Sequence, residues 1–281
     1  MKVAVITDSG SNYYGEKISK EGLFCVPLQV IDQDTGYREG IEITSLETYD
    51  LIDQGKMLKT SAPLVADIEK VVDEIIAAGY DAIFGVNITT GLSSTISTVT
   101  MICQQKEITY DYFDCFTTAR VQLECAFKAL DMFNQNKSVS EVKEALQVMI
   151  DHSNTFVIPV DMQHLVRGGR LTPIAAKLAG LLKIVPVLYL NEETKGRIES
   201  YKKVRTLKRA FETVIDEMVA EKVDETYKIC VTHVKDSKAG QLFMKMLKER
   251  IHQADAYLVD LVSVVGVHTG LGCVATQYVK K

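Results

Sequence analysis

The order of strand-like and helix-like segments limits this chain to a few folds. In its first half, apolar runs at residues 1–7, 81–88 and 108–113 each lead through a small polar turn into a helical pattern. Parallel strands need a long crossover between them, and a helix is the usual crossover. The repeated order therefore predicts an α/β fold with a largely parallel N-terminal sheet, covered by helices on both faces.

Local signals support the helices and divide the chain. Pro63 after Ser61 marks the start of a helix over residues 64–79, and Ser138 with Glu141 forms a capping box before another. A break near residues 150–155 predicts two domains, residues 1–153 and 154–281. The other predicted elements are strands at 24–31, 155–160, 184–190, 197–203, 227–234, 256–265 and 273–279, a polar turn at 32–40, and helices at 45–54, 172–182, 204–221 and 238–252.

Composition and charge exclude several classes of protein. The 281 residues are 47% hydrophobic, which is enough for two packed domains. The formal net charge is -5 and no long basic run occurs, so we expect no nucleic acid partner. The cysteines lack a C-x-x-C pair and the histidines lack ligand spacing, so we expect reduced cysteines and no metal. With no signal peptide and no apolar run of membrane-spanning length, we expect a cytoplasmic protein.

A dense group of hydroxyl side chains follows the run at 81–88. Residues 87–95 read Asn-Ile-Thr-Thr-Gly-Leu-Ser-Ser-Thr, with five hydroxyls between Thr89 and Thr95. Ligands of open α/β sheets bind beyond the carboxyl ends of the strands, and a following helix start favours an anion. Gly91 would let the backbone approach such a ligand closely. The plainer interpretation is that Ser93 or Ser94 caps a helix.

Three small polar clusters lie at predicted element boundaries: Thr60-Ser61, Ser93-Ser94-Thr95 and His268-Thr269-Gly270. If they converge, they form a pocket of neutral hydrogen-bond donors with one imidazole. Such a pocket suits a carboxylate on an apolar body, because a buried carboxylate is costly unless it is hydrogen-bonded. Neither G-x-G-x-x-G nor a phosphate loop occurs, so no cofactor of the dinucleotide class and no ATP site are expected.

Catalysis is an alternative for the same residues. Ser93 as nucleophile and His268 as base would make an acyl hydrolase or transferase, with Asp260 as the carboxylate that could fold nearby. No G-x-S-x-G elbow is present, and His268 can equally be a core or turn histidine. Arg167 and Arg170 are either ordinary exposed charges or, on the intervening Gly-Gly turn, a rigid contact for an anion or a partner.

At these residues the sequence resembles the DegV family of bacterial fatty-acid-binding proteins, which includes the acyl-carrying subunits of fatty acid kinase. Six landmarks occur in order across nearly the whole chain. They are Thr7-Asp8-Ser9, Thr60-Ser61-x-Pro63, Gly91-Leu92-Ser93-x-Thr95, Leu165-x-x-Gly168-Gly169-Arg170, Lys183-Ile184-x-Pro186 and Gly266-Val267-His268-x-Gly270-x-Gly272.

The resemblance implies two α/β domains with a long-chain fatty acid in a tunnel between them. It implies that Ser61 and Ser93 bind the carboxylate, that His268 completes the network, and that Arg167 and Arg170 face a partner kinase. The kinase would bind ATP and phosphorylate the carboxyl group, so this chain would be a carrier and not an enzyme. A regulator that only senses lipid is a further alternative, and a transient membrane surface is left open as a partner.

The sequence departs from the family pattern at three positions. Ser94 stands where the family usually has glycine, Leu271 where proline is common, and Cys115 where serine is commoner. A neutral head-group site, without an arginine clamp, is expected to leave the carboxylate available to the partner.

Overall fold

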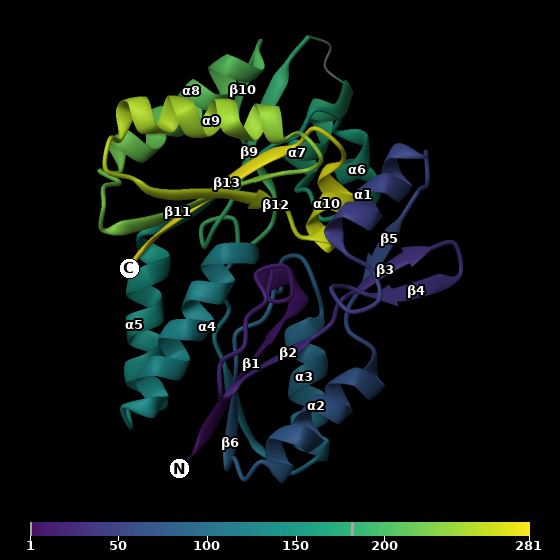
Figure 1. The fold of residues 1–281 in the computed structure, drawn as a ribbon, viewed down its shortest axis with the longest axis vertical. Helices are drawn as coiled ribbons and strands as arrows, with labels where there is room; N and C mark the ends of the chain where they lie inside the picture. Colours follow the sequence, from purple (N-terminus) through teal and green to yellow (C-terminus); the bar gives the residue numbers. More distant parts are fainter. Residues whose placement is uncertain (1, 181–182) are drawn as a thin grey trace.

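Three β-sheets shape the part of the chain that the computed structural model describes, residues 2–180 and 183–281 (Figure 1). The first has the order β2-β1-β6-β7, and each neighbouring pair is parallel. The predicted α/β fold with a parallel N-terminal sheet is confirmed. Its strands are β1 (Val3–Asp8), β2 (Leu23–Val26), β6 (Ala82–Gly85) and β7 (Thr109–Tyr112).

Both faces of this first sheet are buried under helices. Side chains alternate along β1, so Ala4 and Ile6 pack into one apolar layer and Val3 and Val5 into the other. A strand that is buried on both faces must be apolar throughout, which explains the unbroken run at the start of the sequence. The covering helices are α2 (Val65–Ala77) and α3 (Thr95–Gln105) on one face, and α4 (Ala119–Asn134) and α5 (Val139–Asp151) on the other.

The second sheet has six strands in the order β10-β9-β8-β13-β11-β12 and is antiparallel except for the β11–β12 pair. Helices α8 (Leu207–Ala220) and α9 (Ser237–Arg250) cover one face. The other face shares an apolar cluster with the first half of the chain. Its strands are β8 (Ser153–Ile158), β9 (Val185–Leu190), β10 (Glu199–Val204), β11 (Tyr227–His233), β12 (Asp255–Asp260) and β13 (Val274–Lys280).

The chain changes sheet between α5 and β8, which begins at Ser153, and the division into residues 1–153 and 154–281 stays a prediction. We refer to the part through α5 as the N-terminal half and to the part from β8 as the C-terminal half.

A small third sheet, in the order β4-β3-β5, leaves the N-terminal half and lies against the C-terminal half (Figure 1). Helix α1 (Ser45–Asp53), which lies between β4 and β5 in the sequence, packs on α10 (Ser263–Thr269). Residues early in the sequence, in β3 and β5, therefore lie beside α10, the last helix of the described chain. The strands are β3 (Gln29–Asp32), β4 (Thr35–Arg38) and β5 (Lys59–Ser61).

The third sheet corrects two sequence predictions. The single strand predicted at 24–31 is wrong, because Pro27 lies between β2 and β3 and has no N–H to continue a ladder. The polar turn predicted at 32–40 contains β4, and β5 lies directly before the Ala-Pro step. Both strands are short and partly exposed, so their sequences lack the apolar alternation that marks a strand.

Predictions in the C-terminal half are also corrected. The strand predicted at 256–265 ends at Asp260, and the chain enters α10 instead. The helix predicted at 172–182 is a short helix, α7 (Pro173–Ala176), followed by a 3-10 turn, η2 (Lys177–Gly180). Residues 181 and 182 of that prediction lie outside the described residues. A further short helix, α6 (Gln163–Gly168), contains Arg167.

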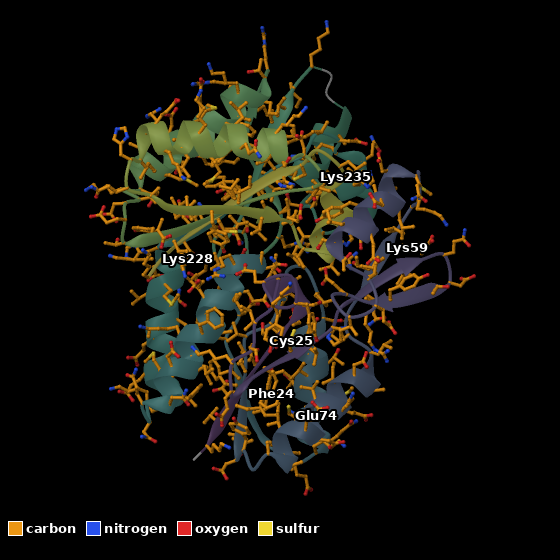
Figure 2. All side chains as sticks on the ribbon, viewed as in Figure 1. Phe24, Cys25, Lys59, Glu74, Lys228 and Lys235 are labelled. Carbon is orange, nitrogen blue, oxygen red and sulfur yellow. The ribbon has the colours of Figure 1, made fainter. Side chains whose placement is uncertain are left out.

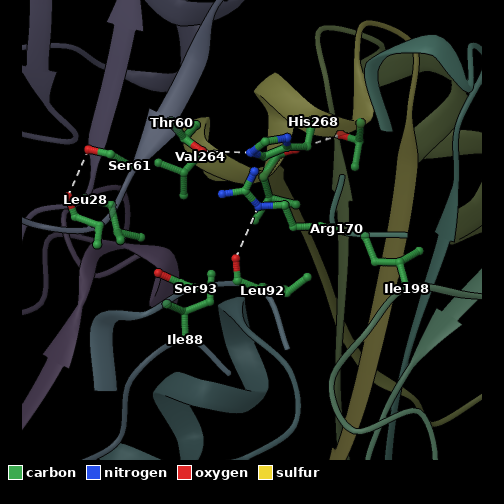
Figure 3. Close-up of a pocket in the computed structure, with 13 residues that line it drawn as sticks. Leu28, Thr60, Ser61, Ile88, Leu92, Ser93, Arg170, Ile198, Val264 and His268 are labelled. Atoms are coloured by element: carbon green, nitrogen blue, oxygen red, sulfur yellow. Dashed lines mark hydrogen bonds between the residues drawn. The ribbon is translucent and has the colours of Figure 1, made fainter. Parts of the chain in front are cut away.

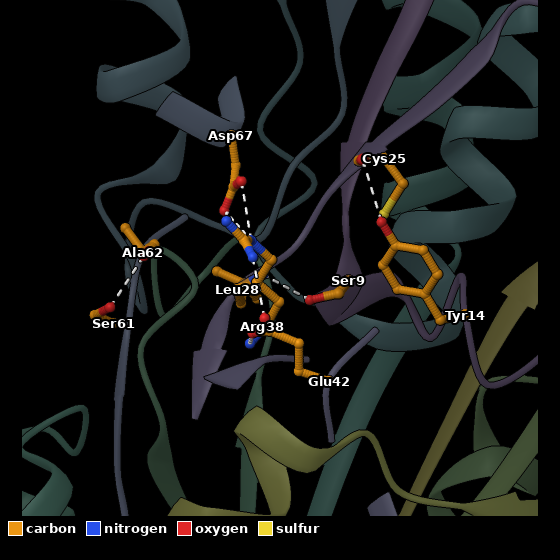
Figure 4. Close-up of polar contacts among 9 residues, drawn as sticks. All are labelled: Ser9, Tyr14, Cys25, Leu28, Arg38, Glu42, Ser61, Ala62 and Asp67. Atoms are coloured by element: carbon orange, nitrogen blue, oxygen red, sulfur yellow. Dashed lines mark hydrogen bonds and ion pairs between the residues drawn. The ribbon is translucent and has the colours of Figure 1, made fainter. Parts of the chain in front are cut away.

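Glu39 is buried where the two halves meet. Ser9 Oγ, in the 3-10 turn η1 (Ser9–Ser11), donates to Glu39 Oε2 at 2.6 Å, and Val264 N at the start of α10 donates to Oε1 at 2.8 Å. Ser9 Oγ in turn accepts from Leu28 N at 2.9 Å (Figure 4). Burial raises the pKa of Glu39 from 4.5 to about 7, although both donors act to lower it. The carboxyl group thus holds Val264 in the first turn of α10. The surrounding sequence is rich in valine, which by itself favours a strand.

Tyr49 and a surface ion pair hold the same contact. The Tyr49 hydroxyl donates to the Leu261 carbonyl, just before α10. Lys235 Nζ lies 2.7 Å from Asp50 and from Asp53 on α1 (Figure 2). Exposed ion pairs usually contribute less than about 1 kcal/mol. The buried hydrogen bonds therefore determine where α10 sits.

Glu39→Gln tests the buried carboxyl through the pH dependence of stability. Because the folded-state pKa is raised, the native protein favours the protonated group, and the stability of wild type relative to the variant falls as pH rises from about 4.5 to about 7. We expect similar unfolding free energies near pH 5 and a relative loss for wild type of about 2 kcal/mol near pH 8. Denaturant unfolding at several pH values measures this difference, with the exposed Glu74→Gln as control (Figure 2). A difference that does not vary with pH would contradict the assignment.

Candidate functional site

A cavity of about 60 Å³ lies between the two halves, beyond the carboxyl end of β6 (Figure 3). Residues far apart in the sequence meet there, because the third sheet and α10 converge on the loop before α3. Its wall is mainly apolar and its polar groups are few. The lining residues are Leu28, Thr60, Ser61, Ala62, Ile88, Leu92, Ser93, Arg170, Ile198, Val264, Val265, His268 and Thr269.

Four of the predicted ligand residues line this one cavity, Thr60, Ser61, Ser93 and His268, and so does Arg170, which was predicted as a partner contact. Strand β5 supplies the first pair, the loop after β6 supplies Ser93, and α10 supplies the histidine near its C-terminal end. The structure therefore joins clusters that the sequence only places at element boundaries. It does not place His268 on a turn after a strand, as predicted, but within a helix.

His268 is joined to Thr60 by a hydrogen bond of 2.7 Å between Nε2 and Oγ1 (Figure 3). The pKa of His268 is lowered to about 4, first by burial and then by the nearby charges of Arg170 and His164. The imidazole is therefore neutral at pH 7. Gly168 lies so close that a Cβ there would collide with the ring at Nδ1, so the backbone of α6 fixes the ring from its other side.

Arg170 makes this cavity cationic, and the expectation of a neutral head-group site is wrong. Its Nε donates to the Leu92 carbonyl at 3.3 Å (Figure 3), and its Nη1 donates to the Gly168 carbonyl at 2.5 Å. Gly169 ends α6 in the left-handed conformation, with φ 68°, which reverses the chain and turns Arg170 inward. The sequence shows the glycines, but it does not show which way the turn points.

The serines of the cavity already have local partners. Ser93 Oγ lies 2.8 Å from Thr95 Oγ1 and accepts from Thr95 N at 3.3 Å. Ser61 Oγ donates to the Ala62 carbonyl at 3.0 Å (Figure 4) and points away from His268 (Figure 3). A ligand that binds Ser61 must therefore draw its hydroxyl away from that carbonyl.

Three predicted ligand residues lie outside the cavity lining. Thr95 is fully buried and supports Ser93, while Ser94 is the exposed N-cap of α3 and makes no side-chain cap bond. Gly91 faces the C-terminal half instead of a ligand, since a Cβ there would lie 2.5 Å from the backbone of Gly196 and Lys195. Its small size permits contact between the two halves, which corrects the predicted close approach to a ligand.

The arrangement disfavours the predicted alternative of Ser-His catalysis. Among the described residues, the hydrogen-bond partner of the His268 ring is Thr60 and not Ser93. Asp260, considered as an orienting carboxylate, lies 3.3 Å from the Nδ1 of a different histidine, His233. The triad geometry that activates a serine is therefore not assembled here.

Within residues 2–180 and 183–281, no group of three or more His, Cys, Asp or Glu side chains is placed to hold a metal ion. None of the helices in those ranges combines the length and the apolar character that crossing a bilayer needs.

Sequence reasoning missed most of the apolar wall. Ile88 precedes the hydroxyl cluster and Leu92 lies within it, so their positions gave a usable signal. Leu28, Ile198 and Val264 come from three other parts of the chain, and their ordinary apolar character gave no such signal. Sequence reasoning also missed Glu39, which lies in a stretch predicted as a polar turn.

Comparison with known proteins gives consistent results along the whole chain. A family model described as "Uncharacterised protein, DegV family" matches residues 2–281. A DegV domain-containing protein of Streptococcus pneumoniae is 30% identical over 284 residues, covering 99% of each chain. A solved structure described as a fatty acid binding DegV family protein from Streptococcus agalactiae is 27% identical, with a TM-score of 0.89 over 100% of this chain and 99% of that one. DegV from Bacillus subtilis, described as a fatty acid binding protein, shares the fold at 24% identity and a TM-score of 0.85, over 100% of each chain.

Gly91→Ala tests the close contact between the halves. The new methyl group would meet the backbone of Lys195 and Gly196, which cannot move away as a flexible side chain would, so we expect destabilisation of about 1–3 kcal/mol. Gly36→Ala is a matched control, because the Cβ there would meet only the far end of the Gln29 side chain, at 3.3 Å. We expect the control to change stability by less than about 0.5 kcal/mol. Equal stabilities of the two variants in thermal unfolding would count against the contact.

Proposed function

This chain belongs to the DegV family, and we propose that it binds a long-chain fatty acid with the carboxylate in the cavity between its halves. The observation that carries the proposal is the convergence of Thr60, Ser61, Ser93, His268 and Arg170 on one mainly apolar cavity. The fatty acid binding described for the Streptococcus agalactiae relative supports it.

The polar groups of the cavity suit one carboxylate. Hydroxyls from Thr60 and Ser93 supply neutral donors, and the guanidinium of Arg170 supplies a single balancing charge. A buried carboxylate that receives several hydrogen bonds remains ionised. The neutral imidazole of His268 adds a polar contact without a second charge, so the head group is held but not fully neutralised by a cluster of cations.

The apolar cluster between the halves is the proposed site of the acyl chain. Leu28, Ile88 and Ile198 belong both to this cluster and to the cavity wall. A water-sized group needs about 10–15 Å³, so the cavity of about 60 Å³ takes the head group and the first few carbons. Binding of the remaining chain therefore requires packed side chains of the cluster to move apart. Burial of each methylene contributes about 0.8 kcal/mol toward that change.

We further propose that the bound carboxylate is presented to an ATP-dependent fatty acid kinase in the cytoplasm. The sequence has no phosphate loop of its own, so a phosphoryl donor would have to come from a partner. Arg167 is exposed beside the cavity, where it can contact such a partner. The chain itself acts as a carrier, which agrees with a histidine that is hydrogen-bonded to threonine and not to the serine.

Ser93→Ala should weaken retention of the fatty acid. Loss of one hydroxyl donor to a carboxylate is expected to lower affinity about tenfold, or about 1.4 kcal/mol. Mass spectrometry of lipid released from the purified protein, followed by binding titration, measures the effect. Ser97→Ala, an exposed serine on the same helix α3, is the control. The same lipid load and affinity in all three proteins would remove Ser93 from the site.

Phosphorylation of the bound lipid should depend on both proteins. When the lipid-loaded protein, a fatty acid kinase and ATP are combined, we expect an acyl phosphate, and we expect none when either protein is omitted. Trapping the product with hydroxylamine detects the activated acyl group. Acyl esters are also incubated with this chain alone, without kinase or ATP. Ester hydrolysis that Ser93→Ala abolishes would support an acyl hydrolase instead.

A further inference from the structure

A second cavity, of about 250 Å³, shares a wall with the first. Thr60, Arg170 and His268 line both cavities, so the hydrogen bond from Thr60 to His268 lies at the boundary between them. A group that is attached to a carboxylate in the first cavity can therefore reach the second cavity by crossing the boundary formed by Thr60 and His268.

The polar lining of the second cavity is cationic. It contains Lys56, Lys59, Arg167 and Arg170 together with the imidazole of His164, and none of its lining residues is acidic. Lys56 Nζ is partly balanced by Asp32, at 3.0 Å. Four cationic side chains around one cavity repel one another unless an anion lies between them.

The pKa shifts of His164 and His268 agree with this positive charge. Burial lowers the pKa of His164, the charge of Arg167 lowers it further, and the carboxylate of Asp161 acts in the opposite direction. His268 responds in the same way to Arg170. Both imidazoles therefore stay neutral, and each can contact an anion without adding to the positive charge.

We propose that the second cavity binds the phosphoryl group of an acyl phosphate whose acyl chain occupies the first cavity. This inference rests on the proposed function, which makes the acyl phosphate the product. In that reaction a carboxylate oxygen bonds to the terminal phosphorus of a nucleoside triphosphate held by the kinase. The bond from this phosphorus to its bridging oxygen breaks, and the nucleoside diphosphate leaves with the electron pair.

The geometry divides the cations between two roles. Arg170 lines both cavities and is held by two backbone carbonyls, so it can contact the head group before and after phosphorylation. Arg167 lines only the second cavity, where a guanidinium can bind two phosphoryl oxygens at once. Arg167 should therefore distinguish the phosphorylated lipid from the free acid.

The test compares two ligands that differ in the phosphoryl group. Palmitate is titrated beside its ketophosphonate, in which a methylene replaces the bridging oxygen and prevents hydrolysis. Arg167→Gln should weaken phosphonate binding about tenfold and change palmitate binding less than about twofold. Arg250→Gln is the matched control, because Arg250 pairs with Asp216 at 3.0 Å and lines neither cavity. It should leave both affinities unchanged.

A second readout separates recognition from a merely structural effect. Phosphonate binding should raise the pKa of His164, measured by NMR titration, since a nearby anion stabilises the imidazolium. Palmitate should leave that pKa unchanged. Equal weakening of both ligands in Arg167→Gln, or no shift at His164, would overturn the assignment.

Inorganic phosphate and the free acid identify which proposal has failed. If wild type binds inorganic phosphate as tightly as the phosphonate, the cavity recognises free phosphate and the acyl phosphate assignment is wrong. If wild type binds palmitate but gains nothing from the phosphonate, the inference fails while the proposed function stands. If it binds neither palmitate nor the phosphonate, the proposed function itself fails.

Discussion

The buried carboxyl group of Glu39 is the interaction on which the site depends. It accepts hydrogen bonds from Ser9 at the end of the first strand and from Val264 at the start of α10, so it ties the two halves of the molecule together. Helix α10 carries His268, and its position sets the distance between that imidazole and Thr60. Burial of this carboxyl group raises its pKa, so the two hydrogen bonds are held against the cost of burying a carboxylate.

Charge is distributed around the site so that an anion can be held and still react. Arg170 is the cation among the lining residues of the first cavity, and burial, together with the charge of Arg170, lowers the pKa of His268 and keeps it neutral. The other cations gather beyond the bond between Thr60 and His268. A carboxylate between these regions would meet one guanidinium and several neutral donors. Such a head group would be bound firmly, yet its oxygens would remain reactive toward phosphorus.

The apolar contact between the halves serves packing and binding at once. The same side chains that fill the interface also wall the cavity, so an acyl chain must replace contacts that the halves make with each other. Close-packed protein interiors do not accept added volume unless side chains rearrange. The glycines at positions 91 and 196 allow backbone from the two halves to meet directly, which fixes part of the interface and leaves the movement to the side chains around the cavity.

The sequence by itself determined the parallel N-terminal sheet, because strands buried on both faces must be apolar and must alternate with helices. It also singled out Ser61, Ser93 and His268, since hydroxyls and an imidazole at element ends are unusual for a core. The tertiary structure decided the rest. Arg170 turned inward, α10 formed where a strand was predicted, and Gly91 met backbone instead of a ligand. These outcomes depend on contacts between residues far apart in the chain, and local propensity and spacing carry no information about such contacts.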